Sequence, residues 1–309
     1  MAIYHLNVKG ISPARGESII TAANSQSGQA LRSYRSGRLH RKSNGTTFIQ
    51  SGIELPATAP HLDREELWNL AEAAWPGGTS IVAKRFTLAL PRELPTSMQV
   101  SAVREFCNLF PTRARDWSIR DDGDGNPHAL ILVSSYDLTD SGFVKPPSQS
   151  KTRFYACRDI NGEEVNVRTG DWKAAKANGT EKIYNFKDGK KRTMSEAKAE
   201  GLSTADRTSK APVSFTITQD GITAYAAEVA ALKRIRASWA EIANRLLAAH
   251  ALETDTPFEP IDHRTYKDRG MDRVPMLHEG NRPLDWVIKA NKERRELNAA
   301  IMTTEKPGA

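Results

Sequence analysis

Hydrophobic and polar positions alternate strictly over residues 2–9, and this period of two predicts a strand at the start of the chain. Small apolar and polar residues over 15–33 then favour a helix, although the glycines in this stretch weaken the pattern. Asp63 and Glu66 have the spacing of a capping box, which predicts the start of a second helix that ends before Pro76. The first segments therefore predict one strand followed by two helices.

The next part of the chain has the patterns of a sheet with a helix packed on it. A strand is expected over residues 81–91, and apolar residues at steps of three and four after Pro95 predict an amphipathic helix. Two further strands are expected over 117–120 and 128–135, joined by a turn rich in Asp and Gly. This order of elements predicts the α+β class with a central, mainly antiparallel sheet and helices packed on it.

The pattern changes after Ser135, and this change divides the chain into three parts. We expect a first domain part over residues 1–135, an elaborated basic insertion over 136–225, and a helical completion of the domain over 226–309. Within the insertion, periodicity is weak, and a short hairpin is expected over 153–167. Long apolar stripes then predict a helix over 226–250, packed against the core, and a last helix over 283–302.

Composition narrows the classes of protein that the sequence fits. The net charge is +7 and the isoelectric point is about 9.3, which favours a polyanionic partner. No apolar run approaches the roughly 20 residues of a membrane span, and residues 1–30 lack the apolar block of a signal peptide, so we expect a cytoplasmic protein. The two cysteines, Cys107 and Cys157, are too few for a disulfide scaffold or a four-cysteine zinc site and predict buried thiols.

Five segments in chain order carry a resemblance to a known family. They are MAIYHL at 1–6, LALPREL at 88–94, GDGNPHA at 123–129, SWA and NR within 238–245, and IDHRT at 261–265. Together they resemble the relaxase domain of the MobA/MobL family of plasmid mobilisation proteins over about residues 1–280. The resemblance implies a relaxase fold of the HUH type, with a central antiparallel sheet of about five strands.

The resemblance also implies a chemistry and a set of partners. Such relaxases nick one DNA strand at a transfer origin, through a tyrosine that becomes joined to the 5′ phosphate. Three histidines hold Mg²⁺ or Mn²⁺ against that phosphate, and two of them come from a His-hydrophobe-His triplet on one strand. The implied partner is DNA, single-stranded or in a hairpin near a transfer origin, together with relaxosome or secretion-coupling proteins, and no membrane.

This sequence departs from the family pattern at the expected metal ligands. The triplet begins at His128 but has Leu130 in place of its second histidine. The third ligand should lie eight residues before the triplet, where the chain has Arg120, a cation that repels a divalent metal. The family often carries acidic residues where this chain has Arg85 and Thr87. We therefore predict that the metal site is lost, that no cofactor is bound, and that His128 is a polar residue of the core with a hydrogen-bond partner.

Two residues compete for the position of the catalytic tyrosine. Ungapped counting, both from Met1 and back from Glu54, gives Ser25 in that position. Tyr34 lies nine residues further on and begins the family's own Tyr-Arg-Ser-Gly motif, which would require a longer helix and a shorter loop. If Ser25 acted as the nucleophile in place of the tyrosine, it would need a base to activate its hydroxyl. Counting favours Ser25 at this position, and Tyr34 is the alternative nucleophile.

Five cations follow close upon one another without an intervening acid, which favours a surface that contacts phosphate groups over a merely solvated face. They are Arg32, Arg35, Arg38, Arg41 and Lys42. The leading hypothesis is a DNA-binding relaxase-fold protein of a mobile element that lacks metal-dependent nicking. The alternatives are a divergent, active relaxase that uses Tyr34 and a relaxase fold that acts as a protein-interaction module. Whether the protein is an enzyme stays open.

Overall fold

A six-stranded sheet forms the centre of the protein in the computed structural model, which describes residues 4–41, 48–75, 77–78, 80–121, 125–145, 152–217, 223–277 and 284–304. Its order is β1-β5-β7-β6-β4, and β8 pairs with β7. The strands are β1 (Leu6–Ile11), β4 (Phe48–Glu54), β5 (Ala83–Ala89), β6 (Arg113–Arg120), β7 (His128–Thr139) and β8 (Gly142–Val144). These pairs are antiparallel, so the predicted α+β class with a mainly antiparallel sheet is confirmed.

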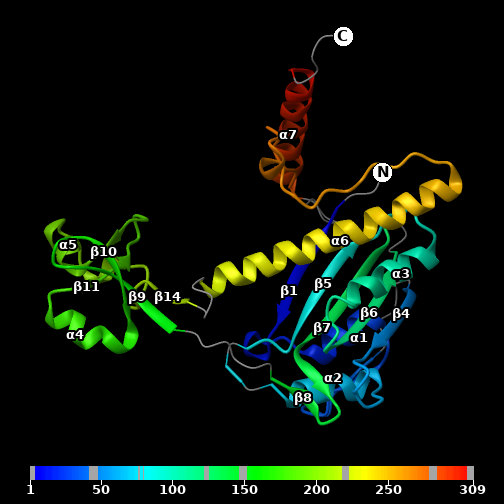
Figure 1. Ribbon diagram of the computed structural model, residues 1–309, viewed down its shortest axis with the longest axis horizontal. Helices are drawn as coiled ribbons and strands as arrows, with labels where there is room; N and C mark the ends of the chain where they lie inside the picture. The colour runs from blue at the N-terminus through cyan, green and yellow to red at the C-terminus, as the bar shows by residue number, and fades with distance from the viewer. Residues whose placement is uncertain are drawn as a thin grey trace.

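Helices cover both faces of this central sheet (Figure 1). The helices α1 and α2 pack on one face, and α3 and α6 pack on the other. The helices outside the insertion are α1 (Ile19–Ser27), α2 (Arg64–Ala73), α3 (Thr96–Cys107), α6 (Ala224–Thr254) and α7 (Asp285–Thr304). The capping box predicted at Asp63 and Glu66 is present at the start of α2, because each residue binds the backbone N–H of the other.

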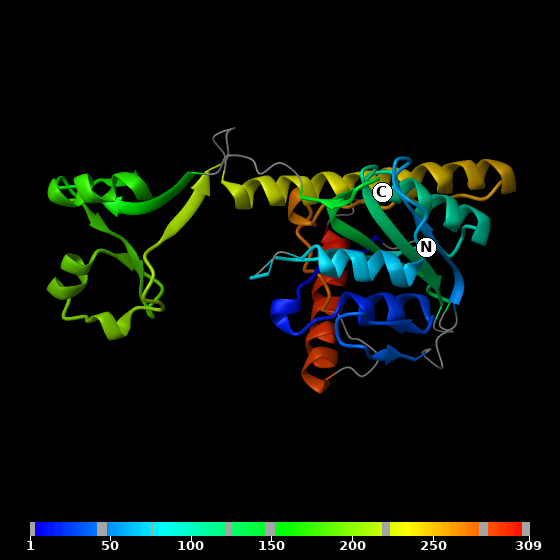
Figure 2. The ribbon, with the colours of Figure 1, turned by 90° about the horizontal axis from the view of Figure 1, so that it is seen from below.

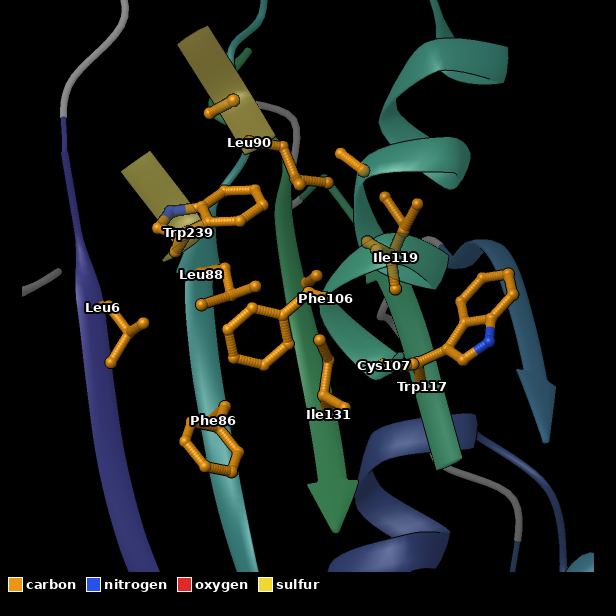
Figure 3. Packing of buried hydrophobic residues seen from close by; sticks show 14 of the residues in the cluster. Leu6, Phe86, Leu88, Leu90, Phe106, Cys107, Trp117, Ile119, Ile131 and Trp239 are labelled. Carbon is orange, nitrogen blue, oxygen red and sulfur yellow. The ribbon is translucent and has the colours of Figure 1, made fainter. Parts of the chain in front are cut away.

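The larger apolar cluster lies between the sheet and helices α3 and α6. Phe86 of β5 and Ile131 of β7 point to this side, where they meet Phe106 of α3 (Figure 3). Trp239 of α6 closes the cluster, with its ring centroid 6.0 Å from that of Phe106 and nearly perpendicular to it. Because successive side chains of a strand point to opposite faces, the residues next to these in β5, β6 and β7 point to the α1 face, where the polar residues of the candidate site lie.

The helix predicted over residues 15–33 is shorter in the structure, and this corrects the expectation. The helix α1 ends at Ser27, because Gly28 adopts a left-handed backbone conformation with φ of 69° and caps the helix. The chain then forms a small hairpin of β2 (Leu31–Arg32) and β3 (Leu39–His40). The predicted basic segment therefore lies on this hairpin and not on a helix.

A second sheet lies to the side of the central one, within what we call the inserted module, residues 152–217 (Figures 1 and 2). Its elements are β9 (Thr152–Arg158), β10 (Glu164–Arg168), α4 (Trp172–Ala177), β11 (Glu181–Lys182), β12 (Tyr184–Asn185), β13 (Lys191–Arg192), α5 (Met194–Ala199) and β14 (Ser214–Ile217). The strands β9 and β10 form the hairpin expected over 153–167. Buried Cys157, Ile183 and Phe186 give the module apolar residues of its own.

Short 3-10 helices complete the described elements: η1 (Pro13–Arg15), η2 (Thr169–Asp171), η3 (Thr204–Asp206) and η4 (Lys267–Arg269). Cys107 and Cys157 are both free and buried, as their number predicted. The strand β7 runs to Thr139 and pairs there with β8, so the central sheet extends past residue 135. Among the helices of the described ranges, none is long and apolar enough to cross a membrane.

Candidate nucleic-acid interface

Residues from four strands, with the residue that precedes β1, form one row across the α1 face of the central sheet. His128 begins β7 and lies directly opposite Ala89 of β5 on one side and Arg120 of β6 on the other. The row continues to Phe48 of β4, opposite Arg120, and to His5, whose backbone carbonyl accepts a hydrogen bond from the Ala89 amide. Directly paired residues of antiparallel strands point to the same face, so these side chains share one side of the sheet.

The structure brings together the three positions that the resemblance gives to metal ligands. Arg120 pairs with His128 across the strands, and Leu130 is two residues along β7 on the same face. Only His128 of the three has a lone pair that a cation could use, and its Nδ1 donates a hydrogen bond to the Asn126 carbonyl, 3.3 Å away. This donor set does not suit a divalent cation. No group of three or more His, Cys, Asp or Glu side chains that could hold a metal occurs among the described residues.

Arg85 brings a second guanidinium group to this face from β5. Its Nη2 donates a hydrogen bond of 2.8 Å to the Ala22 carbonyl of α1. Its Nε is buried and has no hydrogen-bond partner in the described part of the chain. Burial lowers the pKa of the Arg85 guanidinium, and the positive charge of Arg120 lowers it further. The two arginines therefore stand close enough to repel each other, although both remain charged.

Ser25 lies on the exposed side of α1, near Arg85. It lines a surface pocket of about 330 Å³ together with Arg85 and Lys9. The end of α1 also reaches the row, because the Phe48 ring packs so closely on Gly28 that a Cβ there would lie 2.4 Å from a ring carbon. The position that ungapped counting gives to the nucleophile is therefore beside the row, and it holds a serine.

Tyr34 occupies a different place, in the turn between β2 and β3. Its side chain is 60% exposed, and its backbone N–H donates a hydrogen bond of 2.7 Å to Asn69 of α2. Desolvation raises the pKa of the Tyr34 phenol, and the negative charges of Glu65 and Glu66 raise it further. A nucleophilic tyrosine benefits from the opposite shift. The surroundings of Tyr34 therefore keep its hydroxyl protonated.

The basic segment is displayed on the β2–β3 hairpin. Arg32, Arg35, Arg38 and Arg41 are exposed, while Lys42 lies outside the described residues. Within the described ranges, the guanidinium groups of these four arginines have no carboxylate within 4.0 Å, although the backbone N–H of Arg32 donates a hydrogen bond of 2.6 Å to Glu65. The guanidinium carbon of Arg35 lies 5.7 Å from the centre of the Trp75 ring. The hairpin therefore offers solvent-accessible positive charge.

A buried ion pair on the same face is a feature that the sequence reasoning missed. Arg64 of α2 donates two hydrogen bonds, of 2.9 and 3.0 Å, to the carboxylate of Asp116 on β6. Trp68 donates a third, of 2.8 Å. All three side chains are buried, so the network fixes α2 on the sheet. An available signal was the aspartate within the otherwise buried strand that contains Trp117.

Comparisons with known proteins agree with this architecture. The model of the MobA/MobL family matches residues 17–285. The chain belongs to the MobA/MobL family. A solved structure described as "Molecular Basis of Vancomycin Resistance Transfer in Staphylococcus aureus" covers 86% of this chain and 100% of its own, with a TM-score of 0.50 and 18% identity. That likeness shows the shared fold.

Named relatives of this MobA/MobL chain come from several bacteria. A probable mobilization protein MobA of Bifidobacterium longum (strain NCC 2705) is 29% identical over 289 residues, which are 91% of this chain and 43% of that protein. The mobilization protein MobL of Acidithiobacillus ferridurans is 25% identical over 91% of this chain and 62% of its own length. The conjugal transfer protein TraA of Agrobacterium fabrum is 24% identical over 96% of this chain and 24% of its own length. The chain thus spans less than two thirds of each of these relatives.

Proposed function

We propose that this protein binds DNA for the transfer of a mobile element, by plasmid mobilisation or conjugation, and that it lacks metal-dependent nicking. The observation that carries the proposal is the row that places Arg120 and Leu130 beside His128. A guanidinium group and an aliphatic side chain cannot replace two imidazole ligands, yet the guanidinium group suits a phosphate. The chemistry of this face therefore favours DNA binding over metal-assisted cleavage.

The absence of nicking is tested on a supercoiled plasmid that carries the element's own transfer origin. The protein is incubated with the plasmid and Mn²⁺ and then denatured, and protein-linked nicked circles are sought on a gel. We expect none, because Arg120 and Leu130 stand in place of two metal ligands of the family pattern and Ser25 stands where counting places its tyrosine. An adduct that disappears in Tyr34→Phe would instead establish the divergent, active relaxase.

DNA binding through the β2–β3 hairpin is tested by the dependence of affinity on salt. Each lost phosphate contact lowers the slope of log affinity against log salt by roughly 0.7–0.9. The triple change of Arg32, Arg35 and Arg38 to alanine should therefore flatten the slope by about two to three units. A matched control is the change of Lys173, Lys176 and Lys198, which are exposed on the inserted module, to alanine.

Two outcomes would contradict this assignment. Equal slopes in the hairpin variant and in the wild type would place the DNA surface elsewhere on the protein. No DNA binding even at about 50 mM salt, where phosphate contacts are strong, would favour the protein-interaction module.

A further inference from the structure

We propose that Arg85 and Arg120 together bind one backbone phosphate of DNA on the sheet face that holds the metal ion in the family pattern. Two guanidinium groups would then supply the positive charge that a divalent cation supplies in that pattern. The inference rests on the proposed function for the identity of the ligand, a single DNA strand. It goes further by naming the residues that replace the ion and by predicting that binding needs no metal.

The register of the strands places the two arginines around one small area. Thr87 of β5 and Leu130 of β7 lie directly opposite each other at its centre, and Ser118 of β6 lies opposite Leu130. Arg85 is two residues from Thr87 on β5, and Arg120 is two residues from Ser118 on β6, both on the same face. The two arginines thus stand at opposite corners of this area, and the guanidinium carbon of Arg120 lies 5.9 Å from the centre of the Phe48 ring of β4.

The charge on Arg85 is only partly compensated in the protein alone. Within the described ranges no carboxylate lies within 4.0 Å of Arg85, and its hydrogen bond to Ala22 uses one of its five N–H groups. Its buried Nε has no partner in the same ranges, and Arg120 adds a repelling charge. The negative charges of Glu17 and Asp116 act on Arg85 only from beyond ion-pair distance, so part of the cost of burying this cation remains, and a bound phosphate would lower it.

The same face is accessible from the side of β1. The helix α1 covers β6, where Gln26 donates a hydrogen bond to the Asp116 carbonyl. The side chains of His5, Asn7 and Lys9 on the edge strand are exposed. A single DNA strand could therefore lie along β1 and β5 and bring a phosphate to Arg85 without displacing α1. Leu130 and Ser118 at the centre of the area are buried, so the opening lies beside Arg85, in the surface pocket that Arg85 shares with Ser25 and with the ion pair of Lys9 and Glu17.

The test measures the binding of a fluorescein-labelled single-stranded oligonucleotide by fluorescence anisotropy, with EDTA present throughout. We expect wild-type binding to be unaffected by EDTA, and Arg85→Met and Arg120→Met each to weaken it about tenfold or more, the usual effect of losing a charge-assisted hydrogen bond. The matched control is Lys84→Met, which removes the same charge from the adjacent residue on the opposite face of β5. It should change affinity by less than about twofold.

A second measurement does not depend on DNA. Thermal unfolding is followed with and without inorganic phosphate, at constant ionic strength set with chloride. Phosphate should raise the melting temperature of the wild type and of Lys84→Met, and it should leave Arg85→Met unchanged. Without phosphate, Arg85→Met should melt no lower than the wild type, because the variant loses a poorly compensated charge. That result also shows that the variant folds.

The outcomes separate this inference from the proposed function. If the wild type binds DNA and Arg85→Met binds it as well as Lys84→Met does, the arginine pair holds no phosphate, while the proposed function stands. A requirement for Mn²⁺ in binding would likewise overturn the inference. If the wild type binds no DNA, the proposed function is wrong, and a phosphate response retained by Arg85→Met would overturn the anion site as well.

Discussion

Arg64 and Arg85 both bring a guanidinium group to the α1 face of the central sheet, but their surroundings differ. On the β6 side, Arg64 is buried and donates two hydrogen bonds to the carboxylate of Asp116. On the β5 side, Arg85 is half-buried, donates one hydrogen bond to a backbone carbonyl, and faces another cation. The same side chain therefore has a paired carboxylate in one region and, among the described residues, none at ion-pair distance in the other.

This difference separates a structural role from a binding role. The pair formed by Arg64 and Asp116 joins two elements distant in the sequence, and the protein needs both charges to keep them together. Within the described ranges Arg85 has no carboxylate at ion-pair distance, although Glu17 and Asp116 act on it from further away, so its charge remains available to a ligand that supplies an anion. The following variants test this contrast between the β6 side and the β5 side.

The largest effect is expected for Asp116→Asn. It leaves the buried Arg64 without a counterion, which should lower the free energy of unfolding by about 3–5 kcal/mol, measured by urea denaturation. The double variant Arg64→Met with Asp116→Leu should recover part of this loss, because it removes both charges together. If Asp116→Asn destabilised the protein no more than Arg85→Met does, the contrast between the two regions would be wrong.

A smaller effect is expected for Trp68→Phe. This change keeps most of the buried ring but removes the indole N–H that donates to Asp116. A hydrogen bond to a charged group contributes about 1.5–3 kcal/mol, and we expect a loss in that range in the same urea experiment. Trp117→Phe on the other face is the comparison, since its indole N–H donates a longer and therefore weaker hydrogen bond, of 3.3 Å, to Glu54. Equal losses in the two variants would mean that the hydrogen bond to Asp116 adds little.

The smallest effect is expected for Glu17→Gln, on the β5 side. A hydrogen bond from Lys9 and another from the Ser12 backbone lower the pKa of Glu17 from 4.5 to about 2. The carboxylate therefore adds stability that is complete above about pH 4.5 and is lost as the pH falls toward 2. The difference in melting temperature between wild type and variant should shrink over that window, and a constant difference would contradict it. At neutral pH the variant should bind DNA slightly more tightly, because one negative charge is gone beside Arg85.

The sequence predicted the long elements of the fold well and the short ones poorly. The helix α6 and the strands β5 and β7 have long, regular patterns, because each buries one whole face or stripe. The strand β4, with exposed Gln50 and Ser51 and a bulge, shows no such regularity and was not predicted. The inserted module contains strands of two residues, which are too short to show a period, and its fold depends on contacts that only the folded chain makes.

The part of the candidate site that depends on the spacing of residues along paired strands was predictable from the sequence. Arg120 precedes His128 by eight residues, and the hairpin of β6 and β7 turns this spacing into direct pairing. The contact of Arg85 with Ala22 and the pair of Arg64 with Asp116 depend on how helices dock on the sheet, which no local pattern specifies. Their energetic contrast could therefore be recognised only in the folded protein.

The two ends of the inserted module have a consequence for how this protein can be altered. Thr152 and Ile217 are paired residues of β9 and β14, so the chain leaves the module one strand spacing from where it came in. The module thus begins and ends on neighbouring strands of its own sheet. Recombination or design could exchange it for a short linker, or for another small domain, and leave the arrangement of the core helices and strands unchanged.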